Sequence, residues 1–415
     1  MSYGDETPGG FSPQGLAQIP ATLQGFVDQG ALAGVVTLLW RKGEVAQVNT
    51  IGVRDIATKA PMTRDTLFRI ASMTKPVTSV AALMLIEEGK LSLEDPITRW
   101  LPEFKDMRVL KDATGPVDAT SPAPRDITVE DLFTHRGGLA YAFTSQGPIA
   151  HEHERVLGPP LAPGFGPDQW LERLASLPLS YPPGERFHYS HATEVLGFLV
   201  ARIEGRLLGE VLEERIFGPL GMTDTGFWVA PEDRDRLAHL YRLDPGGLTD
   251  VSFPHTEAPI DFEAGGGGLV STADDYLKFA RMLLGKGELD GVRLLKPETV
   301  ELMTKNRLTE AQRAQPFLGL PFWTAQGFGL GVSMILDPAN IGFLGAGPEG
   351  SFGWPGAFGT WWQADPKNDL VAIYLIQDSM PLGPEAVTQM ANQDRPSGRL
   401  ALPMFQKMVY AALGQ

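Results

Sequence analysis

The sequence predicts an α+β protein whose antiparallel sheet is built from both ends of the chain. Strand-like patterns occur at 34–53 and again at 358–376, whereas helical patterns and long loops dominate the middle. The simplest packing forms one sheet domain from residues 1–75 and 260–415, beside a mostly helical domain of residues 76–259. A ligand cleft is expected between them, where a buried helix begins near the edge of the sheet.

The N-terminal elements follow from their hydrophobic periodicity. Apolar residues at helical spacing over 14–28 predict an amphipathic helix. Two apolar runs that flank Lys42 and Gly43 predict a β-hairpin over 34–53. A further helix is expected to begin near Ser72 and to end at Gly89, because glycine readily adopts the left-handed conformation of a helix stop. Its segment 80–86 is apolar on every face and is therefore expected to be buried all round.

The middle and the C-terminal part combine loops, helices and a second hairpin. Residues 104–127 and 158–167 lack periodicity and predict long loops, while 168–176 and 192–217 predict helices. A run of glycines at 265–268 precedes the sequence S-T-A-D-D, which is expected to start a helix with an N-cap and an acidic first turn. The sequence D-P-K-N at 365–368 predicts the turn of a hairpin, and 398–413 predicts a final amphipathic helix.

Composition excludes several classes of function. The net charge of -15 and the pI of about 5.0 argue against a nucleic-acid surface and an anionic membrane as partners. The chain has no cysteine, which excludes thiol nucleophiles and thiolate metal sites. Its first residues lack the basic and apolar regions of a signal peptide, and no segment is long and apolar enough for a membrane span. These features favour a soluble cytoplasmic protein that acts on a small molecule.

Ser72 and Lys75, in the sequence S-M-T-K, are the first candidate catalytic pair. Residues three apart share one face of a helix, so Lys75 is expected beside Ser72. A serine hydroxyl becomes a good nucleophile when a neighbouring base removes its proton. A lysine is such a base only when neutral, a form that apolar surroundings favour. The alternative is a helix-capping serine with a solvated lysine, and Pro76 is expected to distort this first turn.

Two distant segments supply candidate partners for this pair. Tyr189 stands at a loop-to-helix junction, where its hydroxyl could share a proton with Ser72 and Lys75. The glycine-containing stretch 353–360 enters a strand, and its glycines allow a substrate to approach the backbone. The N–H of Ala357 is expected to form an oxyanion hole with the N–H of Ser72.

These motifs together resemble the serine β-lactamase and penicillin-binding-protein superfamily on its class C-like side, in particular the family VIII carboxylesterases. The resemblance covers most of residues 20–380 and includes S-M-T-K, L-F-T-H-R-G-G-L, Y-P-P-G-E-R-F-H-Y-S, P-L-G-M-T-D-T and G-G-G-L-V-S-T-A-D-D-Y. It implies the β-lactamase/transpeptidase-like fold and no cofactor. It also implies that Ser72 is the acyl nucleophile and that Lys75 and Tyr189 are its general base and acid, in an order that the sequence leaves open.

Two departures from the family pattern bear on the substrate. His191 stands where the family's Y-x-N motif has an asparagine, and we weigh it as either a loop residue or a substrate contact. Trp354, Pro355 and Gly356 replace the family's K-T-G or H-x-G, which removes the cation that would bind the carboxylate of a β-lactam. Similar family VIII esterases carry a tryptophan here, so Trp354 and Gly356 are predicted to contact an ester substrate.

Several other signals are interpreted as structural. His151, Glu152 and His153 are expected in a solvated loop, so no metal site is predicted. His135 and His188 are expected to be structural. The acidic pairs at 87–88, 213–214 and 274–275 are expected on solvated faces.

The sequence therefore predicts a serine carboxylesterase that cleaves small esters by ping-pong acyl transfer. Alternatives within the fold are a weak β-lactamase, a D-aminopeptidase or amidase, and an acyltransferase. The alternative from another class is a non-catalytic sensor that is acylated without turnover.

Overall fold

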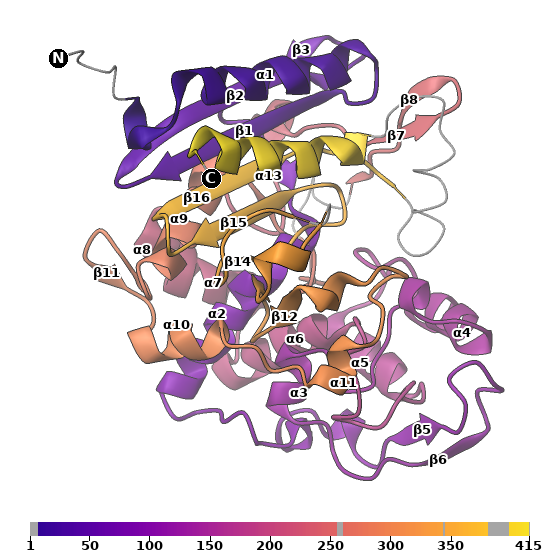
Figure 1. The fold of residues 1–415 in the computed structure, drawn as a ribbon. Coiled ribbons are helices and arrows are strands. Elements are labelled where there is room, and N and C mark those ends of the chain that lie inside the picture. Colours follow the sequence, from indigo (N-terminus) through magenta and orange to yellow (C-terminus); the bar gives the residue numbers. More distant parts are fainter. Residues whose placement is uncertain (1–6, 255–259, 343–344, 381–397, 415) are drawn as a thin grey trace.

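The structure, a computed structural model, describes residues 7–254, 260–342, 345–380 and 398–414. Its centre is an eight-stranded sheet in the order β12-β13-β14-β15-β16-β1-β2-β3, and all neighbouring strands pair antiparallel. Strands from the N-terminal end therefore lie beside strands from the C-terminal end (Figure 1), which confirms the predicted α+β fold. The strands are β1 Gly34–Arg41, β2 Glu44–Asp55, β3 Ala60–Pro61, β12 Gln326–Phe328, β13 Ser333–Ile335, β14 Phe352–Gly353, β15 Trp361–Asp365 and β16 Leu370–Leu375.

Strand β1 is buried on both faces, which explains its mostly apolar sequence, and its buried Thr37 accepts a hydrogen bond from Asn49. Val35 and Leu39 belong to the hydrophobic cluster on one side of the sheet, and Val36 and Leu38 belong to the larger cluster on the other. Successive side chains of a strand point to opposite faces, so a strand between two helical layers has apolar residues at most of its positions.

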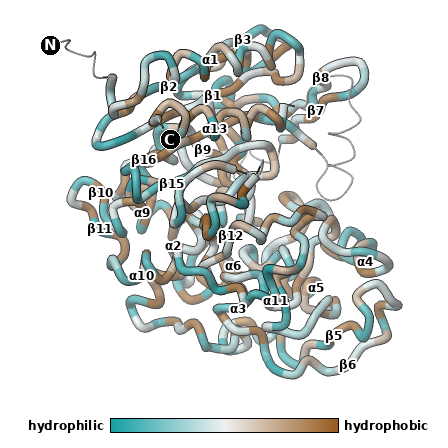
Figure 2. Tube along the Cα trace, in the orientation of Figure 1, coloured by the Kyte–Doolittle hydropathy of each residue, from teal (hydrophilic) through white to brown (hydrophobic). Residues whose placement is uncertain are grey.

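Helices cover both faces of the sheet. On one face α1 (Pro13–Asp28) and α13 (Ala401–Ala412) pack against each other and against the sheet, with Phe26 and Phe405 in their shared cluster. Along α1 the colours of Figure 2 change between teal and brown, as expected for an amphipathic helix. On the other face lies α9 (Ala273–Leu284), which contacts β1, β15 and β16.

Helix α2 (Thr74–Glu87) connects the sheet to the helical part of the molecule. It contacts α6 (Ala192–Glu204) and α7 (Leu208–Leu212), and most of its side chains are buried as predicted. The other described α-helices are α3 Val129–Phe133, α4 Pro148–Leu157, α5 Pro167–Ala175, α8 Gly218–Leu220, α10 Pro297–Met303 and α11 Glu310–Arg313. The small two-stranded sheets pair β4 Phe68–Arg69 with β9 Val270–Ser271, β5 Arg108–Leu110 with β6 Thr120–Pro122, β7 Tyr241–Asp244 with β8 Gly247–Asp250, and β10 Glu288–Leu289 with β11 Val292–Arg293.

Three sequence expectations need correction. The expected loop at 104–127 contains the β5–β6 hairpin. The expected helix at 192–217 is interrupted at Gly205, whose φ of +67° ends α6. Strands β12, β13 and β14 were not predicted, because each has only two or three residues and lacks a readable alternation.

None of the described helices combines the length and apolar composition that a bilayer span requires. The division into two domains at residues 75 and 260 stays a prediction.

We expect Leu38→Ala to lower the free energy of unfolding by about 2–5 kcal/mol, because it opens a cavity in a packed core. Leu38 is fully buried in β1, between Val48 of β2 and Ile373 of β16. Chemical denaturation would measure the change. Val45→Ala is the control, since Val45 is 38% exposed and its truncation should change the free energy by less than about 0.5 kcal/mol. Equal losses in both variants would contradict this account of the core.

Candidate active site

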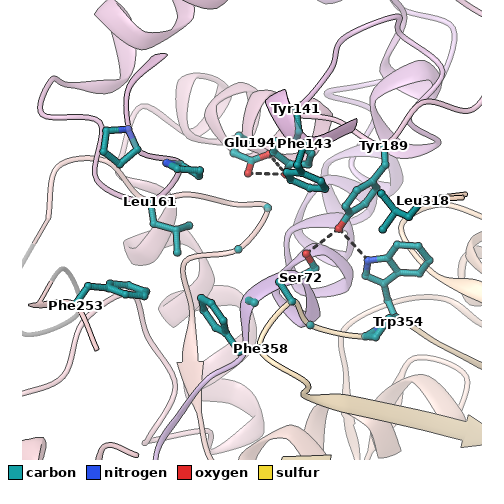
Figure 3. Close-up of a pocket in the computed structure, with 18 of the residues that line it drawn as sticks. Ser72, Tyr141, Phe143, Leu161, Tyr189, Glu194, Phe253, Leu318, Trp354 and Phe358 are labelled. Atoms are coloured by element: carbon teal, nitrogen blue, oxygen red, sulfur yellow. Dashed lines mark hydrogen bonds between the residues drawn. The ribbon is translucent and has the colours of Figure 1, made fainter. Parts of the chain in front are cut away.

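A cavity of about 730 Å³ lies at the N-terminal end of α2, at the place where the sequence predicts a cleft. Its lining is mostly apolar and comes from distant parts of the chain, including Phe143, Leu161, Phe253, Phe317 and Phe358. Figure 3 shows that Ser72, Tyr189 and Trp354 meet at one side of this cavity. An apolar cavity with a few convergent polar groups is typical of a small-molecule site.

The backbone before Ser72 is strained. A 3₁₀ turn at Ala71–Met73 leads into α2, and Ala71 has a φ of +45°, in the left-handed region that residues with a Cβ rarely adopt. Pro76 does not cause this distortion, contrary to expectation. It lies in the first turn of α2, where a backbone N–H has no intrahelical partner and proline is tolerated.

Ser72, Lys75 and Tyr189 are brought together as the sequence predicts. The Tyr189 hydroxyl donates a hydrogen bond to Ser72 Oγ at 2.7 Å, and Lys75 Nζ lies 3.3 Å from the same oxygen. Lys75 is 1% exposed, so it is not the solvated lysine of the alternative interpretation. A nucleophile within hydrogen-bond reach of two groups that can move its proton is the arrangement that acyl transfer requires.

Tyr189 is held from several sides. Its backbone carbonyl accepts a hydrogen bond from Thr144 Oγ1 at 2.9 Å, and its ring packs against His135 at a centroid distance of 4.7 Å. The Trp354 indole N–H donates to the Tyr189 hydroxyl oxygen at 3.2 Å. Trp354 is 2% exposed, so its N–H serves Tyr189 while part of its ring lines the cavity.

Two residues of the site were missed by the sequence analysis. Tyr141 accepts a hydrogen bond from Lys75 Nζ at 3.2 Å and donates to the Glu194 carboxylate, whose oxygens lie at 2.9 and 3.1 Å. Burial raises the pKa of Glu194, and burial also raises the pKa of Tyr141 well above its ordinary value. A lone carboxylate within the apolar sequence A-T-E-V-L-G-F-L-V was the signal for Glu194.

The glycine run at 265–268 contacts the amino group of Lys75. Lys75 Nζ donates to the Gly266 carbonyl at 2.6 Å. A Cβ on Gly266 would lie only 2.4 Å from a carboxylate oxygen of Glu194, so a side chain at this position would displace that carboxylate. These glycines serve close packing of the backbone against the site.

The segment 354–357 also lines the cavity. Gly356 lines it, and a Cβ there would lie 2.3 Å from the carbonyl oxygen of Ile70, just before the Ser72 turn. Ala357 lines the cavity too, and its N–H makes no hydrogen bond within the described residues, so it remains available to an oxyanion. Glycine is therefore required at position 356, because the backbone there lies close to the backbone of Ile70.

His191 lies outside the described lining of this cavity. It is 5% exposed and packs against the rings of Tyr141 and Trp170, with centroid distances of 4.2 and 5.2 Å. Burial lowers the pKa of His191 well below its ordinary value. His135 and His188, which were expected to be structural, also have lowered pKa values because they are buried.

Two polar clusters differ from expectation. His151, Glu152 and His153 lie on helix α4 rather than in a loop, and His153 is buried while His151 is exposed. Asp275 is 2% exposed and accepts the Asp224 N–H at 2.7 Å, so it ties two segments together instead of facing solvent. Within the described part of the chain, no group of three His, Cys, Asp or Glu side chains could hold a metal ion.

Known proteins share sequence similarity with almost the whole chain. Residues 19–395 match the family described as "Beta-lactamase". Protein Rv1367c of Mycobacterium tuberculosis (strain ATCC 25618 / H37Rv) is 52% identical over 95% of this chain and 98% of its own length. Esterase EstB of Burkholderia gladioli is 31% identical over 86% of this chain and 90% of its own. Lovastatin esterase of Penicillium rubens is 32% identical over 87% of this chain and 92% of its own length.

Solved structures show the same fold. The chain is similar to EstCE1, described as a hydrolase with promiscuous acyltransferase activity, with a TM-score of 0.78 and 27% sequence identity. The match covers 96% of this chain and 99% of EstCE1.

We expect the buried histidines to make stability depend on pH. Burial lowers the pKa of His153 to about 4, below its value near 6.5 in the unfolded chain. The contribution of neutral His153 to the free energy of unfolding is therefore fully present above about pH 6.5 and is lost as the pH falls toward 4. His153→Phe should reduce the loss of unfolding free energy between pH 7 and pH 5 by about 1–2 kcal/mol. Urea denaturation at both pH values checks this. His151→Phe, on the exposed side of the same helix, is the control, and an equal effect there would refute the assignment.

Proposed function

The chain belongs to the beta-lactamase family, and from this premise we propose that it is a serine carboxylesterase that forms an acyl-enzyme on Ser72. The observation that carries the proposal is the contact of Ser72 Oγ with both Tyr189 and Lys75 beside an apolar cavity. The similarity to EstB and to lovastatin esterase, two proteins named as esterases, supports it.

In the proposed acylation, Ser72 Oγ attacks the ester carbonyl carbon and forms a new C–O bond. The Ser72 proton passes to the Lys75–Tyr189 pair, and the carbonyl oxygen becomes an oxyanion near the N–H groups of Ser72 and Ala357. When this intermediate collapses, the bond to the alcohol breaks and the same proton reaches the leaving oxygen. Water then repeats these steps on the acyl-enzyme, which releases the acid and restores Ser72.

The cavity favours neutral, apolar acyl groups over β-lactams. A β-lactam carries a carboxylate that its enzymes bind with a cation, and Trp354 stands at the corresponding position here. Among the described lining residues, Arg399 carries a guanidinium, but this group contacts Asp378 and the Ala357 carbonyl. A substrate carboxylate would have to compete with these partners.

Acyl transfer to an alcohol other than water is a second candidate activity. The same acyl-enzyme serves both reactions, and the outcome depends on which nucleophile reaches it. The apolar lining favours a hydrophobic alcohol over water, and EstCE1 is described as having acyltransferase activity beside hydrolysis.

We predict that Ser72→Ala abolishes both ester turnover and covalent labelling by an organophosphonate, without a change in circular dichroism. The mutation removes the only oxygen that the mechanism acylates. Labelling followed by intact mass spectrometry measures the result, and Ser176→Ala on an exposed loop is the control. Labelling that persists at another serine would end the proposal. A burst of one equivalent without turnover in the unmodified protein would instead indicate an acyl-binding protein.

We also predict a much higher kcat/KM on p-nitrophenyl butyrate than on nitrocefin. A hydrogen bond to a charged group contributes about 1.5–3 kcal/mol, so a missing cation corresponds to roughly ten- to hundredfold weaker recognition of a carboxylate. Trp354→His should narrow the gap by raising activity on nitrocefin, whereas Trp228→His on the exposed surface should leave it unchanged. Equal turnover of both substrates by the unmodified protein would show that another cation binds the carboxylate.

A further inference from the structure

Glu194 is a buried carboxylate for which the mechanism above has no use. It lies in the first turn of α6, is 3% exposed and also lines the cavity beside Ser72. Both of its oxygens lie within hydrogen-bond distance of the Tyr141 hydroxyl (Figure 3). While Glu194 is ionised it only accepts hydrogen bonds, and in that state the single proton of Tyr141 is directed to it.

This arrangement restricts the hydrogen bonds of Lys75. Its Nζ has three neighbours, namely the Gly266 carbonyl at 2.6 Å, the Tyr141 hydroxyl at 3.2 Å and Ser72 Oγ at 3.3 Å. The carbonyl can only accept. Tyr141 must also accept, because its proton is committed to Glu194. Two N–H groups of Lys75 are therefore fixed by acceptors, and the third position faces Ser72.

The third position is the one that matters for catalysis. In the ammonium form it holds an N–H, and in the neutral amine it holds the lone pair. Without Glu194, the Tyr141 hydroxyl would be free to donate its proton to that lone pair and would compete with Ser72 for it.

We propose that Glu194 is a positioning residue that acts through Tyr141 to direct the exchangeable proton site of Lys75 toward Ser72. This inference rests on the proposed function. The hydrogen-bonded chain has a fixed direction, because its first member, the Trp354 indole, only donates and its last member, Glu194, only accepts. Between them Tyr189, Ser72, Lys75 and Tyr141 each accept from one neighbour and donate to the next when Lys75 is neutral.

The proton balance of acylation is unchanged by this assignment. The Ser72 proton moves to the Lys75 lone pair, either directly or through Tyr189, and later moves to the leaving alkoxide. Glu194 and Tyr141 neither gain nor lose a proton in the cycle.

The test uses three variants of the full-length protein, Glu194→Met, Tyr141→Phe and the double variant. The measurement is the rate of acylation by p-nitrophenyl butyrate in the pre-steady state. Positioned acid–base groups typically contribute factors of 10² to 10⁴, so Glu194→Met should lower the rate by about 100-fold. Tyr141→Phe removes one hydrogen bond of Lys75 and should cost only about 10-fold, because no hydroxyl remains to compete for the lone pair.

The deciding result is the double variant. Removal of the Tyr141 hydroxyl should raise the rate of Glu194→Met to within about threefold of Tyr141→Phe alone, a rescue that non-additive partners in one network permit. Loss of packing or of a countercharge would instead make the double variant as slow as Glu194→Met or slower, and that outcome would overturn the proposal.

Glu263→Met provides the matched control. Glu263 is another partly buried glutamate with a raised pKa caused by burial, but it accepts the Gly209 N–H and does not contact Tyr141. Tyr141→Phe in the Glu263→Met background should lower the rate as it does in the unmodified protein, and a rescue there would refute the specific role of Glu194. Failure of the proposed function is distinguishable, since the unmodified protein would then not turn over the ester at all.

Discussion

The candidate active site is organised around the burial of one amino group, that of Lys75. A buried polar group is costly unless its hydrogen bonds are satisfied, and a long basic side chain at the head of an apolar helix needs acceptors from elsewhere in the chain. Gly266, Tyr141 and Ser72 provide them, from the glycine run, the segment before α4 and the turn before α2. Gly266 also lies close to the carboxylate of Glu194, which accepts the hydrogen bond of Tyr141.

Trp354 connects this polar group to the apolar cavity. Its N–H holds the hydroxyl of Tyr189, and its ring packs with Phe317 and Phe328 in a cluster of aromatic side chains. Aromatic packing of this kind fixes the ring orientation. Trp354 therefore supports Tyr189, the proposed acid–base residue, and also forms part of the apolar lining of the cavity.

Much of the fold and the central residues of the site could be predicted from sequence, because they depend on local patterns. The apolar run of β1, the buried helix after Ser72 and the hairpin at 365–368 are each readable in a few residues. Tyr141 and Glu194 were missed because their roles depend on a contact between residues far apart in the chain. Helix α4 was taken for a loop although Pro148 and Gly158 mark its two ends in the usual way.

The pairing of β1 with β16 has a consequence for the synthesis of the chain. Thr37 of β1 lies opposite Tyr374 of β16, so one edge of the N-terminal hairpin has no native partner until nearly the whole polypeptide has left the ribosome. Contacts between such distant residues slow folding, and an unpaired apolar strand edge invites association with other chains. Translation that stalls before residue 370 would leave this edge of β1 without its partner strand, and the truncated chain would be prone to aggregate through that edge.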